Sequence, residues 1–209
     1  MALGSVSYAS VVFSLPSGTV DAMPTVNDIF VDGPVVFDGI TWTATGQSVF
    51  GYTSSWAFSS NGDWDGTLGP MAGVDDNTDI MTFAPSSPVA GIGGFINYAQ
   101  PGEGTATIAA CDAADVLIES YTLTFTTGGG INVGEFLGFS ESTADIAYFE
   151  LTGATVGLTG LTVQENPSSS SLPEPGTVDL MLAGLGLLML ARKIGPTKVR
   201  KHPNPPINR

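Results

Sequence analysis

Carboxylate side chains that could bind a metal ion are concentrated in the segment 61–79. The segment opens with Asn61-Gly62-Asp63-Trp64-Asp65-Gly66 and continues through Asp75, Asp76, Asn77 and Asp79. Oxygen ligands at alternate positions ahead of a glycine turn are how a loop wraps a hard cation, and Ca²⁺ takes about six to eight of them. An EF-hand is excluded, because the twelfth position counted from Asn61 is Ala72 and not a bidentate Glu. The segment predicts either a solvated Asp-Gly turn or a Ca²⁺ site formed by Asp63, Asp65, Asp75, Asp76 and Asp79.

Aromatic side chains in and near this segment suggest a second kind of site. Trp42, Tyr52, Trp56 and Trp64 could include a platform on which a sugar ring stacks. Trp42 and Trp56 lie in strand-like runs, so we expect them in the core. Trp64 lies in the Asp-rich stretch, so we expect it to be exposed and to be the candidate for sugar stacking.

Acid–base and nucleophilic catalysis have few candidate residues. The single histidine, His202, lies in the C-terminal tail, so the body can form no Ser-His-Asp or Cys-His arrangement and no ordinary zinc site. The single cysteine, Cys111, has no nearby base and is expected to be an ordinary buried thiol. A glycosidase needs two carboxylates across a cleft. Spacing selects no pair among Glu103, Glu119, Glu135, Glu141 and Glu150. We therefore expect that the protein is not an enzyme.

Residues 168–201 carry three signals in a fixed order. A Ser-rich stretch leads into Pro173-Glu174-Pro175-Gly176, an apolar run follows from Leu180 to Ala191, and a basic cluster begins at Arg192-Lys193. The two prolines hold the chain extended, as a protease substrate must be. The apolar stretch 177–191 would span about 22 Å as a helix, short of the roughly 30 Å hydrocarbon core, and snorkelling of the basic pair lengthens it. We expect a single membrane-spanning helix with its C-terminal end in the cytoplasm.

This tail resembles that of the PEP-CTERM family of exported bacterial proteins. The resemblance rests on Leu172–Thr177, on the Leu/Gly/Ala-rich span through Leu190 and on Arg192-Lys193. Such a tail is also labelled the ice-binding protein C-terminal domain. The resemblance implies that an exosortase, a membrane-embedded protease of the transpeptidase type, recognises and cuts near Pro173, Glu174, Pro175 and Gly176. Arg192 and Lys193 would then stop the tail in the membrane. The chain departs from the family pattern after Lys193, because it continues through a Pro-rich extension to Arg209.

The sequence of the body has the pattern of β-strands. Gly, Asp, Asn or Pro punctuates nearly every gap between apolar or β-branched runs, and residues in 105–108 and 121–125 alternate between polar and apolar. The pattern predicts an antiparallel β-sandwich of the jelly-roll type. The runs are Val11–Leu15, Asp28–Val31, Pro34–Phe37, Ile40–Thr45, Trp56–Ser59, Ile80–Ala84, Val89–Tyr98, Thr105–Cys111, Val116–Thr126, Val133–Phe139, Ile146–Leu151 and Val156–Val163.

Composition and sequence signals divide the chain into five parts. With 43% apolar and 12% charged residues, the chain can bury one core. Ser7-Tyr8-Ala9 fits the small-x-small rule for signal-peptide cleavage but lacks the upstream segment, so we expect the true start to lie upstream of Met1. The predicted parts are a signal-peptide remnant (1–10), a β-sandwich body (11–164), a Ser-rich linker (165–172), a sorting tail (173–201) and a Pro-rich extension (202–209).

Charge separates the body from the tail and limits the partners. All twenty Asp and Glu precede Arg192, and all six Lys and Arg lie at or after it, so nucleic acid is not an expected partner of the body. We expect a protein of a Gram-negative-type bacterium that is exported, anchored in the inner membrane until an exosortase acts, and then placed at the cell surface or in the exopolysaccharide matrix. Its expected role is structural or adhesive. The alternatives are a Ca²⁺-dependent carbohydrate-binding module, which would bind extracellular polysaccharide, and a glycoside hydrolase.

Overall fold

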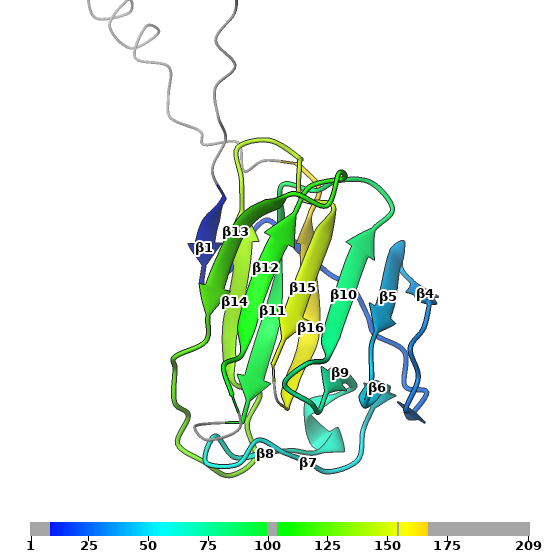
Figure 1. Ribbon diagram of the computed structural model, residues 1–209, viewed down its shortest axis with the longest axis vertical. Helices are drawn as coiled ribbons and strands as arrows, with labels where there is room; N and C mark the ends of the chain where they lie inside the picture. Colours follow the sequence, from blue (N-terminus) through cyan, green and yellow to red (C-terminus); the bar gives the residue numbers. More distant parts are fainter. Residues whose placement is uncertain (1–8, 100–103, 154, 167–209) are drawn as a thin grey trace, which may run out of the picture. The chain divides into compact units, whose positions relative to one another are not determined.

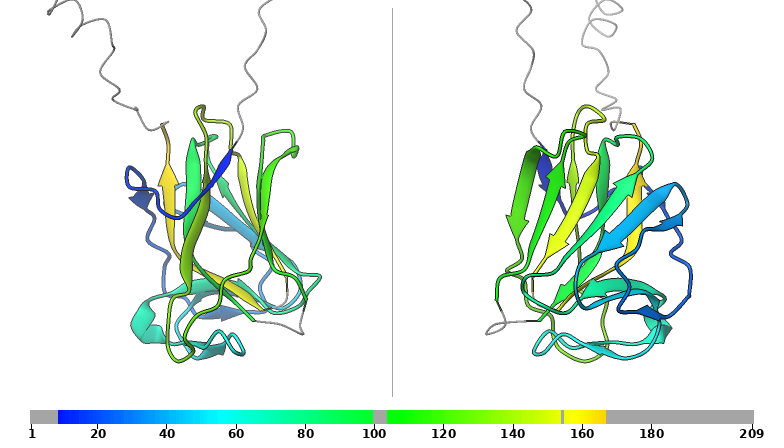
Figure 2. Two further views of the ribbon diagram at one scale, coloured as in Figure 1. Left: turned by 90° about the vertical axis from the view of Figure 1, so that its left-hand side faces the viewer. Right: turned by 45° about the vertical axis from the view of Figure 1, so that its right-hand side comes forward.

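The computed structural model describes residues 9–99, 104–153 and 155–166, and in these ranges the chain is all β. Within them it forms sixteen strands and one short 3-10 helix, η1 (Gly66–Leu68). The strands of the two main sheets pair antiparallel, and the sheets face each other as the layers of a sandwich (Figure 1, Figure 2). The predicted antiparallel all-β fold is confirmed.

The larger sheet has eight strands. They are β1 (Ser10–Val12), β2 (Thr19–Val20), β3 (Asp28–Ile29), β6 (Ser48–Tyr52), β9 (Met71–Val74), β11 (Gly91–Tyr98), β14 (Glu135–Ser140) and β16 (Val156–Gln164). Their order in space is β1-β14-β11-β16-β9-β6-β3, and β2 pairs with β16.

The smaller sheet has six strands. They are β4 (Val35–Phe37), β5 (Ile40–Ala44), β10 (Ile80–Pro85), β12 (Thr107–Cys111), β13 (Leu117–Thr122) and β15 (Tyr148–Thr152). Their order is β13-β12-β15-β10-β5-β4. A separate hairpin consists of β7 (Trp56–Ala57) and β8 (Asp63–Trp64).

From β9 onward the chain passes between the two sheets in a regular order. The larger sheet holds β9-β16-β11-β14 and the smaller holds β10-β15-β12-β13, which is how a jelly roll interleaves its two Greek keys. In this arrangement the connections β10–β11, β12–β13 and β14–β15 meet at one end of the sandwich (Figure 1). The β7–β8 hairpin lies at the opposite end.

The core lies between the sheets because alternate residues of each strand point inward. Phe139 of β14 and Phe149 of β15 are fully buried and meet from opposite sheets with ring centroids 6.1 Å apart. Trp42 of β5 is also fully buried and packs against Phe50 of β6 at 4.7 Å, so its predicted place in the core is confirmed. Burying side chains of this size contributes about 1.5–3 kcal/mol each.

Each of the twelve strand-like runs overlaps an observed strand. The sequence did not predict β2, β6, β8 or β9. The ladder of β13 ends at Thr122, ahead of the predicted Thr126, although Leu123 stays buried in the main core.

The described part of the body begins and ends close to the predicted boundaries. Ala9 is buried in the main core and Ser10 begins β1, and both lie in the segment 1–10 that the sequence predicts to be a signal-peptide remnant. β16 ends at Gln164, the predicted end of the body. Residues 1–8, most of the predicted linker, the sorting tail and the extension lie outside the described residues. Within the described ranges, no helix has the length and apolar character needed to cross a membrane.

Candidate functional site

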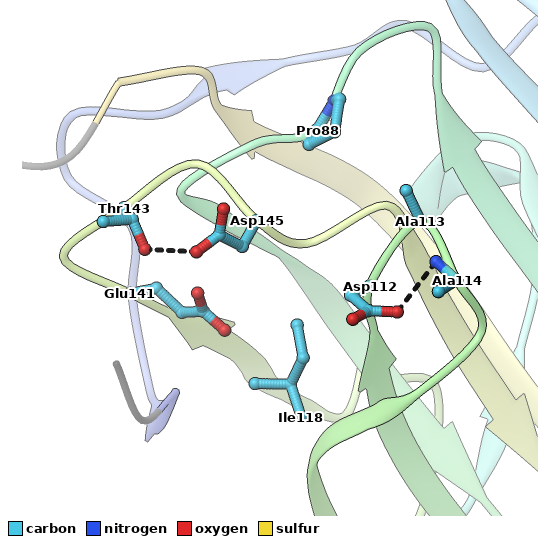
Figure 3. A pocket seen from close by; sticks show the side chains of 8 residues that line it. All are labelled: Pro88, Asp112, Ala113, Ala114, Ile118, Glu141, Thr143 and Asp145. Atoms are coloured by element: carbon cyan, nitrogen blue, oxygen red, sulfur yellow. Dashed lines mark hydrogen bonds between the residues drawn. The ribbon is translucent and has the colours of Figure 1, made fainter. Parts of the chain in front are cut away.

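An acidic hollow lies at the end of the sandwich where three strand connections meet. Its volume is about 510 Å³, and Figure 3 shows the side chains around it. The β10–β11 connection contributes Pro88, the β12–β13 side contributes Asp112, Ala113, Ala114 and Ile118, and the β14–β15 connection contributes Glu141, Thr143 and Asp145. The walls thus combine three carboxylates with an apolar surface. We call this site the acidic hollow.

Backbone hydrogen bonds fix the connections that form the acidic hollow. Val89 and Ile146 exchange two of them, with N–O distances of 2.9 and 3.1 Å. The N–H of Glu141 donates to the carbonyl oxygen of Ala90 at 2.7 Å. The N–H of Ala90 in turn donates to the carbonyl oxygen of Gln164 at 2.9 Å. The walls are therefore tied to each other and to the end of β16.

Asp112 occupies one wall because it closes the tight turn between β12 and β13. Its Oδ1 accepts the N–H of Ala114 at 2.8 Å and that of Val116 at 2.9 Å. Asp115 in the same turn has φ of 61°, in the left-handed region, which Asp tolerates better than most residues. One carboxylate oxygen of Asp112 is thus engaged in holding the turn.

Glu141 occupies the opposite wall, directly after β14. Its side chain is only 6% exposed, and its Oε1 atom is buried without a hydrogen-bond partner among the described residues. Burial, and then the charge of Asp145, raise the pKa of the Glu141 carboxyl. Asp145 itself accepts a hydrogen bond from the Thr143 hydroxyl at 2.6 Å through Oδ2 (Figure 3). The hollow therefore holds one buried carboxylate whose charge is not balanced by the surrounding groups.

Cys111 ends β12 immediately before this turn. The thiol is free and buried. Burial, followed by the charges of Glu150, Asp115 and Asp112, raises its pKa to about 11. A thiol with such a pKa stays protonated at neutral pH and is a poor nucleophile. The prediction of an ordinary buried thiol is confirmed.

The structure gives two of the five predicted Ca²⁺ ligands a local role in turns. Asp65 is the N-cap of η1, where it accepts hydrogen bonds from the N–H and the hydroxyl of Thr67. Asp76 accepts hydrogen bonds from the N–H and the hydroxyl of Thr78, both at 3.0 Å, and these bonds lower the pKa of its exposed carboxyl. This is the ordinary behaviour of Asp at a turn.

The other predicted ligands lie in separate surroundings. Asp75 accepts the Thr155 hydroxyl at 2.8 Å, and the buried Asp79 accepts the N–H of Gln47 at 2.8 Å. The Asp63 side chain is exposed on β8. In the part of the chain that the structure describes, no three acidic, Cys or His side chains are placed to hold a metal ion. The five aspartates are therefore not brought together as the predicted cation loop.

Trp64 does not present a face for sugar stacking. Its side chain is 2% exposed and lies in a second small core with Val49, Phe58 and Met71. The prediction that Trp64 is exposed is wrong, because the β7–β8 hairpin folds its large indole inward where it buries the most apolar surface. Trp56 is half-buried against the same small core.

An asparagine network, which the sequence did not reveal, fixes the Asp-rich loop. Asn61 is 1% exposed, donates to the carbonyl oxygen of Tyr98 at 3.0 Å and accepts the N–H of Thr127 at 3.1 Å. Asn97 and Asn132 both donate to the carbonyl oxygen of Asn61, at 3.1 and 3.0 Å. The partners lie 36 to 71 residues from Asn61, so only the fold brings them together. The observed role of this loop is to join the hairpin to the sandwich.

The sorting residues Pro173, Glu174, Pro175 and Gly176 and the basic pair Arg192-Lys193 lie outside the described residues. A family profile described as the PEP-CTERM protein-sorting motif matches residues 171–193. No curated protein matches the chain significantly. No solved structure does so either.

Proposed function

Since residues 171–193 make this chain a PEP-CTERM protein, sorted to the cell surface by an exosortase, we propose that its β-sandwich is a structural or adhesive component of that surface. The motif also implies export and association with the membrane before processing. After cleavage the body remains attached to the envelope or its exopolysaccharide matrix.

The position of the motif relative to the fold is the observation that supports this proposal. β16 is the last strand of the body and ends at Gln164, and the motif match begins at residue 171. The Ser-rich stretch between them can give a protease access without unfolding the sandwich. Cleavage near Pro173–Gly176 would release the body with its hydrogen-bonded sheets intact.

Sorting is tested by following the chain in a strain with and without its exosortase. Mass spectrometry of the surface fraction should find a body that ends near Pro173–Gly176 and lacks His202. The triple variant Pro173→Ala/Glu174→Ala/Pro175→Ala should stay uncleaved in the membrane fraction. The linker control Ser168→Ala/Ser169→Ala/Ser170→Ala should be processed normally. An intact chain through Arg209 in the soluble cytoplasm would contradict the proposal.

The structural or adhesive role is tested by where the cleaved body remains. We expect it to stay with the polysaccharide fraction through washing and to be released when the polysaccharide is digested. Recovery of all the body in the medium before digestion would count against a matrix role.

We also propose that the body is not an enzyme. The support is chemical, since residues 1–201 contain no histidine and the only cysteine carries an unreactive thiol. Incubation of the protein with the polysaccharide of its own surface should release no new reducing ends. A time-dependent release that depends on Glu141 or Asp145 would favour a glycoside hydrolase instead.

A further inference from the structure

The acidic hollow carries an electrostatic imbalance that the body cannot correct with its own side chains. The Oε1 atom of Glu141 is buried without a partner, and Asp145 adds further negative charge beside it. Leaving a buried charged acceptor unpaired destabilises the folded state. The sequence contains no Lys or Arg before Arg192, so no basic side chain of the body can pair with Glu141. A cation from outside would remove the imbalance.

The geometry points to an organic cation: we propose that the acidic hollow binds a small ligand through its primary ammonium group. Glu141 and Asp145 accept N–H groups of the ammonium, and Asp112 faces the ligand from the opposite side of the hollow (Figure 3). Pro88, Ala113 and Ile118 contact the carbon skeleton of the ligand. This binding function is separate from sorting and does not depend on it.

The carboxylates match the donors of an ammonium group better than those of a guanidinium group. An ammonium carries three N–H donors that point in different directions. Asp112 and Asp145 each have one oxygen engaged within the protein, through Oδ1 and Oδ2 respectively, which leaves one oxygen each for a ligand. Figure 3 shows Glu141 and Asp145 on one side of the hollow and Asp112 on the other. A guanidinium pairs best with both oxygens of one carboxylate, but Asp112 and Asp145 each offer one oxygen, and the Oε1 atom of Glu141 is buried.

Two observations disfavour a bare metal ion as the ligand. The hollow of about 510 Å³ has room for an organic molecule and is far larger than one cation. In addition, no three acidic, Cys or His groups among the described residues are arranged to hold a metal. A metal ion gains nothing from the apolar wall, whereas the CH groups of an amine-bearing ligand can pack against it.

The test is calorimetric titration of the full chain in mild detergent with glucosamine, cadaverine and N-acetylglucosamine. N-acetylglucosamine has the same sugar ring as glucosamine but no ammonium. At least one amine should bind tenfold or more tightly than N-acetylglucosamine. Glucosamine binding above cadaverine would identify an amino sugar as the source of the ammonium, and the reverse would identify an alkyl amine. Equal binding of glucosamine and N-acetylglucosamine, with no binding of cadaverine, would overturn the proposal.

Variants separate the hollow from general attraction to an acidic body. Glu141→Gln keeps the shape of the side chain and should weaken amine binding at least fivefold, as should Asp145→Asn. The matched control is Glu135→Gln, which removes one exposed carboxylate from the start of β14, the strand that ends just before Glu141, and should leave the affinity unchanged. Equal weakening by all three variants would reduce the effect to net charge. Displacement of the amine by Ca²⁺, but not by NaCl of the same ionic strength, would assign the hollow to a metal.

Discussion

At the scale of single residues, the buried carboxylate of Glu141 lowers the stability of the native state at neutral pH and provides the charge that the proposed ligand would bind. Its raised pKa means that the native state binds more protons than the unfolded state between the unfolded and folded pKa values. The stability linked to this group is therefore complete below about pH 4.3 and is lost as the pH rises through the folded pKa. A carboxylate kept at such a cost is typical of a site that uses the charge.

Glu141→Gln should stabilise the body at neutral pH, because the amide needs no charge balance. We expect the variant to match the wild type at pH 4 and to exceed it by about 1 kcal/mol at pH 7. Urea unfolding at several pH values measures the difference. The pKa values of Asp21 and Glu150 are also raised, mainly by burial. Both residues are present in the wild type and in the variant, so their effects cancel in the stability difference. A stability difference that stays the same at every pH would contradict this expectation.

Cys111 should resist alkylation in the native protein. With a pKa of about 11 in the fold and about 8.5 in the unfolded chain, the thiolate fraction at pH 8 falls roughly two hundredfold on folding. Iodoacetamide labelling at pH 8, followed by mass spectrometry, should be at least that much slower in buffer than in 8 M urea. Similar rates in the two solvents would show that the thiol is neither buried nor protonated.

Asn61 should matter more for stability than the aspartates that surround it. Asn61→Ala removes the hydrogen bond that the side chain donates to the carbonyl oxygen of Tyr98 and the one that it accepts from the N–H of Thr127. The expected loss is about 2 kcal/mol of unfolding free energy. The control Asn77→Ala changes an exposed asparagine and should stay within about 0.5 kcal/mol. Urea denaturation of both variants checks the ranking, which would be refuted by equal losses.

The Asp-rich loop and the acidic hollow differ in how far the sequence could predict their residues. Asn61-Gly62-Asp63-Trp64-Asp65-Gly66 has the composition of both a metal loop and a capped turn, and local spacing does not separate the two. Which of the two structures forms depends on hydrogen bonds to residues 36 to 71 positions away, which no local pattern contains. Glu141 is one of the candidate carboxylates in the sequence. Its neighbours in the acidic hollow come together only where three strand connections meet in the fold.

At the scale of elements, the larger sheet contains a cross-strand pair of glycines that the fold requires. Gly93 of β11 lies opposite Gly138 of β14. A Cβ added at Gly138 would lie 2.4 Å from the carbonyl oxygen of Ile92 and 2.6 Å from the Cα of Gly93. Both contacts are with backbone, so no side-chain rotation can relieve them.

Gly138→Ala should therefore destabilise the sandwich by about 1–3 kcal/mol, the usual cost of overpacking. The matched control is Gly128→Ala, where an added Cβ meets nothing within 4 Å and the change should be within about 0.5 kcal/mol. Thermal unfolding followed by circular dichroism measures both. Equal melting temperatures for the two variants would show that the strands can separate without cost.

The same elements show why twelve strands could be predicted and four could not. The predicted runs alternate between polar and apolar or form continuous apolar stretches, and burial enforces that pattern. β9 (Met71–Val74) is short, contains a glycine and follows Gly69-Pro70, so its sequence reads as a turn. β2 (Thr19–Val20) is exposed and exists as a strand through its pairing with β16. Tertiary pairing, not local preference, defines such strands.

At the scale of the whole molecule, charge is distributed so that the sandwich is purely anionic. The chain has a net charge of −14, yet its six basic residues all follow residue 191. Repulsion among the carboxylates opposes the compact state and is screened by salt. Cys111 is the only cysteine, so no internal disulfide offsets this repulsion. Stability rests instead on the apolar core between the two sheets.

Added salt should therefore raise the melting temperature of the body, and Ca²⁺ should do so no more than NaCl at matched ionic strength. Each kcal/mol corresponds to about 2–4 °C for a domain of this size, so screening should give a rise of a few degrees. The reason to expect no Ca²⁺-specific effect is that Asp65, Asp75, Asp76 and Asp79 already accept hydrogen bonds in separate places. Melting the wild type and Asp63→Asn/Asp65→Asn in both salts is the measurement. A Ca²⁺-specific rise in the wild type that disappears in the double variant would show that the loop closes around the ion after all.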